Sequence, residues 1–239
     1  MRTRITALRS VACLLVLLAA AIPVAISAAG VPQRVADATT LVLNLVGSSQ
    51  NVYGSNPTFI SWQAPSTART ECSSFLSLLL QHSEGITQAQ LKSWTGSSNP
   101  NAAMYHDAIQ LGKGFTQVWS VEDIRIGDAI AVKYPAGGSS SGHVMLVVSA
   151  PVAAEAISPV VDGTAQYQVT VIDSSASGHG PTDTRYISPN NFTGGIGRGV
   201  MRLYVYPSGQ IAGYTWSTYS NSAYFAQSDR SLVVGRLNQ

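Results

Sequence analysis

Residues 70–82, TECSSFLSLLLQH, carry the pattern that bears most directly on the fold of this chain. The apolar side chains of this stretch recur three and four positions apart, as on one face of an α-helix: Cys72, Phe75, Leu76, Leu79 and Leu80. Thr70 is a suitable N-cap, because its hydroxyl can accept a hydrogen bond from a free backbone N–H group. The pattern therefore predicts a helix over residues 70–82 with Cys72 in its first turn.

Helical patterns also occur on either side of this stretch. Apolar residues over 35–46 predict a helix that packs on the domain, whereas residues 47–69, rich in Ser, Asn, Pro and Gly, predict a loop. Two shorter helices are expected further on, one beginning at Thr87 and one with Asn99 as cap, Pro100 as first residue and Gly112 at its end.

From residue 115 onward the pattern changes to strands. Short apolar runs bounded by Gly, Pro or Ser predict strands over residues 115–119, 129–134, 143–149, 167–173, 200–206, 211–216 and 232–237. Helices first and strands afterwards, with short connections, favour an α+β fold in which N-terminal helices pack on an antiparallel sheet.

The N-terminal residues 1–29 have the order of a secretory signal peptide. Arg2, Arg4 and Arg9 are followed by an apolar run of about 16 residues, which is shorter than the roughly 20 that span a membrane, and then by small residues near 27–29. We therefore expect export to a periplasm or to the outside of the cell, and no membrane association after cleavage.

The charge and the cysteine count of the mature chain limit its partners and its disulfides. The formal charge of the whole chain is +2, and removal of the three signal arginines would leave 11 basic against 12 acidic residues, a charge of −1. Because no basic excess remains, we expect no nucleic-acid partner. Cys72 would be the one thiol of the mature chain, so no disulfide can form within it, and the leftover thiol indicates either pairing with another molecule or a reactive role. The oligomeric state stays open.

Cys72 meets the requirements of a nucleophile. A cysteine must be a thiolate to attack, and the free N–H groups and dipole at a helix N-terminus favour negative charge. The alternative is a buried structural cysteine, since Phe75 and Leu79 share its face.

Among four histidines, His143 is the best candidate for a base, because it follows the flexible run 137–142 and begins an apolar strand. His82 and His106 are expected at the surface or as helix caps. If residues 143–149 and 167–173 pair so that 149 lies opposite 167, Asp173 lies beside His143 and can orient it. Asp173 could instead be a turn residue at a strand end.

Three motifs resemble those of the NlpC-type peptidases, papain-like enzymes related to the CHAP amidases. They are Glu71-Cys72-Ser73-Ser74-Phe75, Ile126-Gly127-Asp128-Ala129 and Ser141-Gly142-His143-Val144. The resemblance implies a papain-like fold over residues 50–239, with residues 30–49 as a lead-in helix. It also implies Cys72 as nucleophile, His143 as base and Asp173 as third residue, and bacterial cell-wall peptides as substrates.

The chain departs from the family at several positions. Glu71, Ser74 and Ile126 replace the usual Asp, Gly and Pro, and the 30 residues between His143 and Asp173 exceed the usual spacing. The residues thus predict a cysteine peptidase or amidase that needs no cofactor. The alternatives are a papain-like domain that binds peptides without cleaving them and an acyltransferase that uses the same thiol.

His179 and Asp183 are candidate substrate-binding residues, or else they brace the cleft together with Arg185. A metal site built from them is not expected, because no metal-binding His spacing is present. Residues 138–142 match G-x-S-x-G but link two strands, so a serine nucleophile is not expected either. The glycine-rich run 194–199 leads into a strand, which disfavours a nucleotide site.

Overall fold

Four α-helices precede most of the strands, as the sequence predicts. The computed structural model describes residues 30–238, so the predicted signal peptide lies outside the described residues. The helices are α1 (Gln33–Leu45), α2 (Cys72–Glu84), α3 (Gln88–Thr95) and α4 (Ala102–Gln110). The predicted helices over 35–46, 70–82 and from Thr87 are thereby confirmed to within a few residues.

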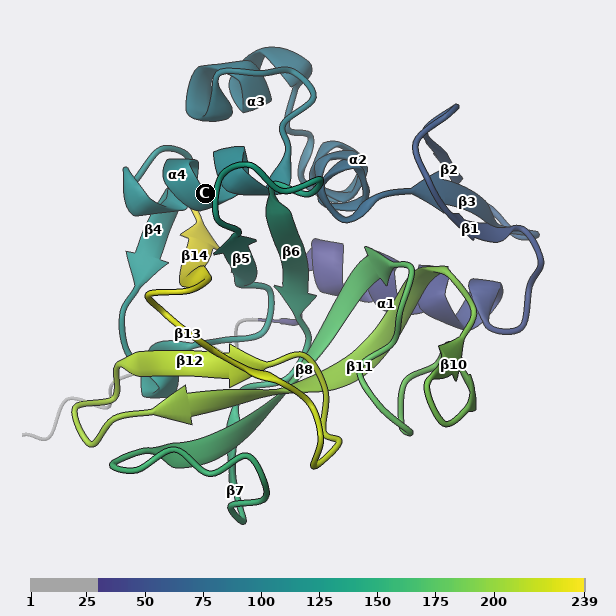
Figure 1. The fold of residues 1–239 in the computed structure, drawn as a ribbon. Coiled ribbons are helices and arrows are strands. Elements are labelled where there is room, and N and C mark those ends of the chain that lie inside the picture. The colour runs from purple at the N-terminus through teal and green to yellow at the C-terminus, as the bar shows by residue number, and fades with distance from the viewer. Residues whose placement is uncertain (1–29, 239) are drawn as a thin grey trace, which may run out of the picture. The chain divides into compact units, whose positions relative to one another are not determined.

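A nine-stranded antiparallel sheet forms the centre of the described chain (Figure 1). Its strands are β4 (Phe115–Val118), β5 (Ala129–Lys133), β6 (Gly142–Val147), β7 (Val152–Ala154), β8 (Ala165–Ser175), β11 (Gly195–Val205), β12 (Ile211–Thr215), β13 (Tyr224–Ala226) and β14 (Ser231–Leu237). Their order is β13-β12-β11-β8-β6-β5-β14-β4, with β7 paired to β8. The chain is therefore an α+β protein, as predicted.

The two faces of this sheet bury separate cores. The sheet curves back towards itself. A bridge between Ser120 and Gln210 shows this, because it links the end of β4 to the start of β12, near the other end of the strand order. Inside the curve lies one apolar cluster, which includes Val132, Met145 and Leu203. On the other face two clusters join the sheet to α1, α2 and α4, and Figure 1 shows α2 and α4 beside β5 and β6.

The predicted loop over residues 47–69 is wrong in part. It contains the strands β1 (Asn51–Tyr53), β2 (Phe59–Ser61) and β3 (Thr67–Thr70), which form a sheet in the order β1-β3-β2. β1 and β3 run parallel, whereas the other strand pairs of the described residues are antiparallel. These strands are three or four residues long and carry no apolar alternation, so only backbone pairing reveals them. A small hairpin of β9 (Tyr186–Ser188) and β10 (Asn191–Phe192) was also not predicted.

Two predicted helix caps lie elsewhere. Glu71, not Thr70, is the N-cap of α2, because Thr70 pairs with Tyr53 as the last residue of β3. Asn101, not Asn99, caps α4, and its Oδ1 accepts the Met104 N–H at 3.0 Å. In both cases tertiary pairing or a later side chain moves the start of the helix by one or two residues.

The predicted pairing of β6 with β8 is confirmed, but its register is not. Leu146 lies opposite Ile172 and Val147 opposite Val171, two positions away from the predicted alignment. Because side chains alternate between the faces of a strand, a slip of two keeps every side chain on its predicted face. Asp173 therefore remains on the same face as His143.

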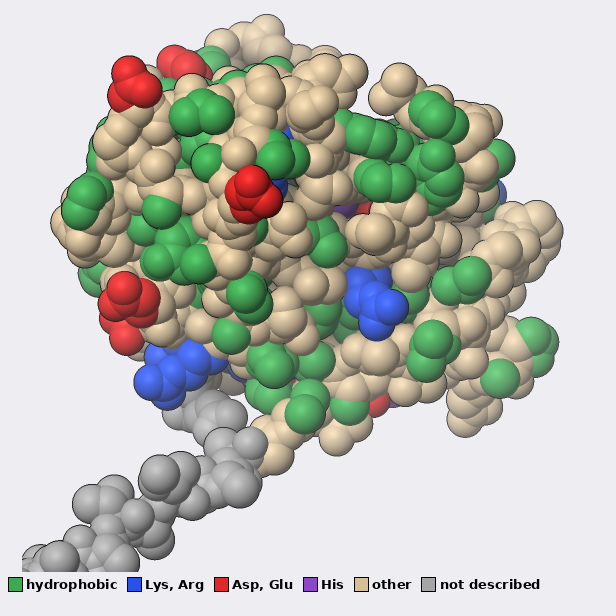
Figure 2. Space-filling model, turned by 90° about the horizontal axis from the view of Figure 1, so that it is seen from below, with side chains coloured by type: hydrophobic (Ala, Val, Ile, Leu, Met, Phe, Trp, Pro, Cys, Tyr) green, Lys and Arg blue, Asp and Glu red, His purple; other side chains and the backbone are tan. Residues whose placement is uncertain are grey.

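Charged side chains are sparse on the surface. Figure 2 shows a face on which a few acidic and basic side chains are scattered among many hydrophobic and uncharged ones. Across residues 30–238, no helix combines the length and the apolar character that crossing a membrane requires.

Candidate active site

Cys72 is the first residue of α2 and lies where three parts of the fold meet. β3 leads straight into the helix, and the Ser174 hydroxyl of β8 donates to the Thr70 carbonyl at 2.7 Å. This bond ties the start of α2 to the strand that carries Asp173. Cys72 is buried, with 7% of the residue exposed.

The first turn of α2 can stabilise negative charge. The first backbone bond of the helix runs from the Phe75 N–H to the Glu71 carbonyl at 2.9 Å, and the Ser74 hydroxyl accepts the Glu71 N–H at 2.9 Å. The N–H groups of Cys72 and Ser73 precede the intrahelical bonding. They are available to a thiolate, or to an oxyanion that forms on a bound carbonyl.

His143 connects Cys72 with Asp173. Its Nε2 lies 2.7 Å from Asp173 Oδ2, which leaves Nδ1 as the ring nitrogen that can interact with Cys72, whose charge acts on the imidazole. The Trp216 ring meets the His143 ring edge to face, at 4.7 Å between centroids. Trp216 is itself held by a 3.0 Å hydrogen bond from its Nε1 to the Gly178 carbonyl. The imidazole is thus fixed from two sides.

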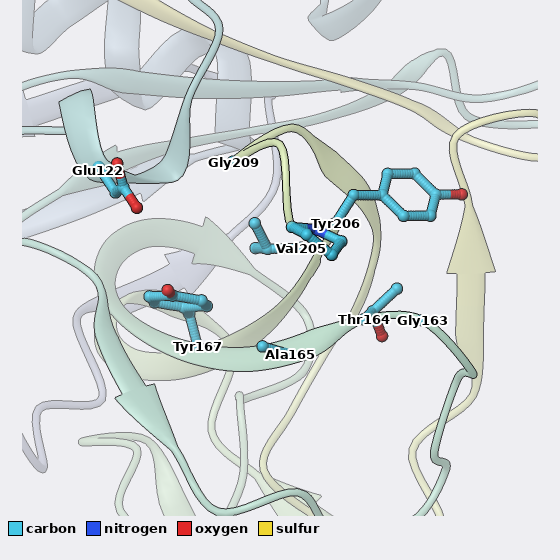
Figure 3. A pocket seen from close by; sticks show the side chains of 9 residues that line it. Glu122, Gly163, Thr164, Ala165, Tyr167, Val205, Tyr206 and Gly209 are labelled. Carbon is cyan, nitrogen blue, oxygen red and sulfur yellow. The ribbon is translucent and has the colours of Figure 1, made fainter.

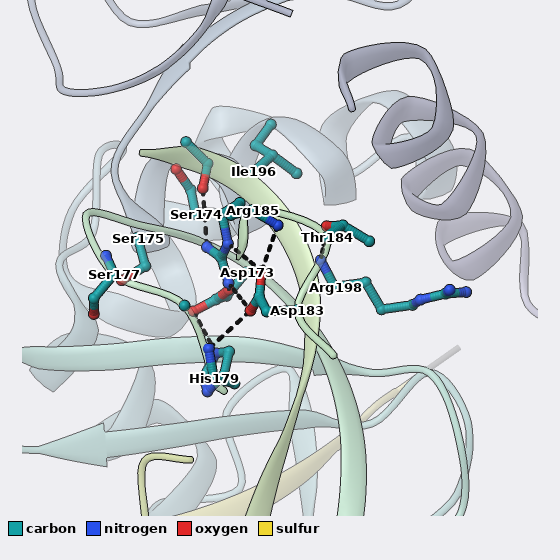
Figure 4. Close-up of polar contacts among 12 residues, drawn as sticks. Asp173, Ser174, Ser175, Ser177, His179, Asp183, Thr184, Arg185, Ile196 and Arg198 are labelled. Atoms are coloured by element: carbon teal, nitrogen blue, oxygen red, sulfur yellow. Dashed lines mark hydrogen bonds and ion pairs between the residues drawn. The ribbon is translucent and has the colours of Figure 1, made fainter. Parts of the chain in front are cut away.

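Asp173 is completely buried and is held by a set of residues that we call the Asp173 brace: His179, Asp183 and Arg185. His179 Nε2 lies 3.1 Å from Asp173 Oδ2, and Arg185 Nη2 donates to Asp173 Oδ1 at 2.8 Å. Asp183 accepts from Arg185 Nη2 at 2.8 Å and from the His179 N–H at 2.8 Å. Figure 4 shows this arrangement between β8 and β11.

His179 and Asp183 therefore serve the second of their two predicted roles. Both side chains are completely buried, and their polar atoms are engaged with Asp173, with Arg185 and with backbone groups. They hold Asp173 and Arg185 in place, so neither the His179 ring nor the Asp183 carboxylate faces a cleft.

The charges of the site support one another. Burial would raise the pKa of Cys72, but the charge of His143 and hydrogen bonds from His143 and the Val144 N–H lower it. Burial would likewise lower the pKa of His143, but the charges of Cys72 and Asp173 and their hydrogen bonds raise it to about 10. Despite burial, Arg185 and His179 hold the pKa of Asp173 well below its usual range. Both pKa shifts favour the pair of a thiolate and an imidazolium over the neutral pair.

The glycine run 194–199 makes room for the Asp173 brace. Gly197 and Gly199 lie on the same face of β11, and a Cβ at either position would collide with the brace, with Arg185 in the first case and with Asp183 and His179 in the second. The run that resembled a nucleotide loop is thus a strand whose missing side chains admit a buried ion pair.

Replacement of Gly197 by alanine is expected to lower activity by at least tenfold, because the new methyl group displaces Arg185 and frees the Asp173 carboxylate to move. Gly30→Ala is the matched control, since no atom lies within 4 Å of a Cβ at that position. The measurement is kcat of each purified variant on one amide substrate. A Gly197→Ala enzyme with the rate of the control would show that the brace does not hold Asp173.

Two further side chains near Cys72 were missed from the sequence. Tyr53 lies in β1, inside the segment predicted as loop, and burial together with the charges of Cys72, Glu71 and Asp173 raises its pKa to about 12. Trp216 was predicted only as the end of a strand. Their identification needs the long-range contacts that bring Tyr53 near Cys72 and Trp216 against His143.

The remaining histidines lie outside this site. His82 stacks on Trp62 at 4.1 Å and is partly exposed, as predicted. His106 is buried, which corrects its predicted surface position, and its ring nitrogens lie near Asp107 and Ser231. Asp128, part of the second motif, accepts from Arg236 at 3.0 and 2.9 Å and so ties β5 to β14.

Other hollows lie away from Cys72. Figure 3 shows one of about 390 Å³ lined by Glu122, Tyr167 and Tyr206, at the end of β8 remote from Asp173. Within residues 30–238 no three His, Cys, Asp or Glu side chains are grouped so that they could hold a metal ion.

Comparison with known proteins finds a viral relative. The chain is 36% identical over 177 residues to an uncharacterized protein of Acanthamoeba polyphaga mimivirus, and the match covers 71% of this chain and 78% of that protein. No family model matches the sequence, and no solved structure matches the fold. The similarity relates the two chains and assigns an activity to neither.

Proposed function

This chain belongs to one family with the uncharacterized mimivirus protein, and we propose that it is an exported cysteine hydrolase of papain-like architecture that cleaves peptide or amide bonds. The observation that carries the proposal is the convergence of three side chains. Cys72 at the start of α2 lies near enough to His143 for each charge to shift the pKa of the other, and His143 Nε2 lies 2.7 Å from Asp173. A nucleophile, a base and an orienting carboxylate in that order are what acyl transfer through a thiolate requires.

The proposed reaction proceeds through an acyl-enzyme. The Cys72 thiolate attacks the amide carbonyl, and the negative charge that develops on oxygen is stabilised by N–H groups of the first turn of α2. The His143 imidazolium then gives its Nδ1 proton to the leaving amine. Next, neutral His143 takes a proton from water, which attacks the thioester and releases the acid. No cofactor takes part.

The proposed substrate class rests on the motifs around Cys72, Asp128 and His143. Their resemblance to NlpC-type peptidases favours bacterial cell-wall peptides, and the signal-like residues 1–29 favour action in a periplasm or outside the cell. The site itself sets only the chemistry, because one fold serves many substrates.

The thiolate should be detectable by alkylation. In the chain without residues 1–29, we expect iodoacetamide to modify Cys72 at a rate that changes little between about pH 6 and pH 8, because the His143 charge lowers the pKa of the thiol. In His143→Ala the rate should fall about tenfold per pH unit below about pH 8.5, as for an ordinary thiol. Cys72→Ala, which has no thiol at this position, gives the background rate of alkylation.

A native thiol that reacts at pH 6 no faster than the same thiol in denaturant would argue against the proposal. The burial of Cys72, which is 7% exposed, would then favour the alternative of a domain that binds peptides without cleaving them. Peptide binding that Cys72→Ala leaves unchanged, together with no turnover, would identify that case. Product analysis with an added amine separates hydrolysis from acyl transfer.

A further inference from the structure

Arg230, just before β14, is a cation without an acidic partner. Its guanidinium carbon lies 3.7 Å from the centre of the Phe225 ring and 4.3 Å from that of Tyr134. Arg34, Arg185 and Arg236 each pair with a carboxylate, whereas no acidic side chain of residues 30–238 lies within ion-pair distance of Arg230. Two aromatic rings hold the guanidinium in place, and its N–H edge has the Tyr134 and Tyr214 hydroxyls, but no carboxylate of the described residues, as neighbours.

A hollow of about 390 Å³ lies at Arg230. It is lined by Arg230, Tyr134 and the loop between β5 and β6, including Gly138, Ser139 and Ser140. None of its lining residues is acidic. The hollow therefore offers one positive charge, hydroxyl groups and an aromatic wall, which suits an anion that has a flat or apolar neighbour.

Strand geometry puts Tyr134, one wall of this hollow, on the face of the sheet that carries His143. Val132 lies opposite His143 in the β5–β6 pair, so their side chains share a face, and Tyr134 follows two positions later on that face. The Tyr134 N–H donates to the Ser141 carbonyl at 3.1 Å, which holds the two strands together beyond His143. Burial raises the pKa of Tyr134, Arg230 lowers it and Cys72 raises it further, as expected if Tyr134 lies between them.

Tyr214 adds a second unsatisfied group to the same cluster. Its ring packs on Phe225 at 5.5 Å, and its buried hydroxyl has no hydrogen-bond partner among the described residues. Burial raises the pKa of Tyr214 and Arg230 lowers it, so this hydroxyl lies near the guanidinium, although Tyr214 does not line the hollow.

We propose that Arg230 binds a carboxylate of the substrate, so that the preferred substrates of Cys72 are amides with an acidic group near the scissile bond. The planar guanidinium of an arginine can donate two parallel hydrogen bonds to the two oxygens of a carboxylate. The Phe225 and Tyr134 rings that pack against Arg230 keep its guanidinium oriented. This inference rests on the proposed hydrolase function, which it narrows from any amide to acidic peptides.

Chloroacetyl derivatives of glycine, β-alanine and γ-aminobutyrate, each as acid and as amide, test the proposal. They place a carboxylate at three distances from the carbon that alkylates Cys72. We expect at least one acid to react about tenfold faster than its amide, which corresponds to about 1.4 kcal/mol. Arg230→Gln should abolish that ratio, while Arg198→Gln, which removes the same charge from an exposed position, should keep it.

Equal rates for all acids and amides, or an acid preference that Arg230→Gln retains, would overturn the inference while leaving the thiolate proposal intact. If Cys72 instead reacts with no probe, the hydrolase proposal fails, and the inference is judged on Cys72→Ala by binding of the corresponding N-acetyl acids and amides. Binding of an acid tenfold tighter than its amide, lost in the double variant with Arg230→Gln, would support a carboxylate site. Equal binding would exclude it. Arg230→Lys keeps the positive charge. It serves as a control for misfolding, because a folded Lys variant should retain part of the preference for the acid.

Discussion

Replacement of Asp173 by asparagine is expected to lower kcat by about ten-thousand-fold, the loss that follows the same change in serine triads. Asp173 accepts from His143 Nε2 at 2.7 Å and thereby directs the other nitrogen, Nδ1, towards Cys72. An asparagine amide presents its NH₂ group to Nε2 when its oxygen is taken by Arg185. The imidazole would then carry its proton on the nitrogen that faces the thiol, and the thiolate would be lost.

The same substitution should also lower stability. Removing one partner of a buried ion pair costs about 3–5 kcal/mol, although Asp183 still pairs with Arg185 and limits the loss. Because the folded pKa of Asp173 lies well below the unfolded value, its contribution is present above about pH 4 and is lost as the pH falls through the folded pKa. Urea unfolding at pH 7 and at lower pH measures both effects.

The matched control for Asp173→Asn is Asp162→Asn, which changes an exposed carboxyl. We expect its stability to stay within about 0.5 kcal/mol of the parent and its kcat to be unchanged. An Asp173→Asn enzyme that retains more than about a tenth of the parent rate would remove Asp173 from the catalytic set and leave it a structural role.

Replacement of Arg202 by methionine is expected to destabilise the fold by about 4 kcal/mol or more. Arg202 is fully buried on β11 and donates five hydrogen bonds, all to neutral oxygens, of Ile157, Ser158, Gln166, Ser217 and Tyr219. Methionine fills similar space and donates no hydrogen bond. Each buried acceptor left without a partner costs about 1–3 kcal/mol, less where water enters.

The loss should reach the active site as well as the fold. Arg202 binds the carbonyls of Ser217 and Tyr219, in the segment that begins at Trp216, and Trp216 packs against His143. Thermal unfolding should therefore shift down by roughly 10 °C, and kcat should fall below that of the parent even at low temperature.

Arg198→Met provides the comparison, because Arg198 is an exposed arginine of the same strand, and Figure 4 shows its side chain directed away from Asp173. Its expected change in unfolding free energy is within about 0.5 kcal/mol. Equal stability of the two variants would mean that the five bonds of Arg202 contribute little beyond what water supplies.

Local patterns were sufficient to predict much of the scaffold of the candidate site. The apolar spacing over residues 70–82 predicts α2, and a helix start needs only a few neighbouring residues to be recognised. The apolar run after His143 predicts β6 in the same way. The register of β6 on β8 was predicted two positions away from the observed one, yet Asp173 faced His143 in both cases, because alternation along a strand survives an even slip.

What the sequence determined by itself is thus the α+β class, the position of Cys72 at a helix start and the place of His143 on a strand. Only the tertiary structure decided how Asp173 is held, because Arg185 and Asp183 reach it through the pairing of β8 with β11, which no local pattern encodes. The same holds for Tyr53, Trp216 and Arg230. Their roles arise from contacts between segments distant in the chain, whereas local patterns report only on neighbours within a few residues.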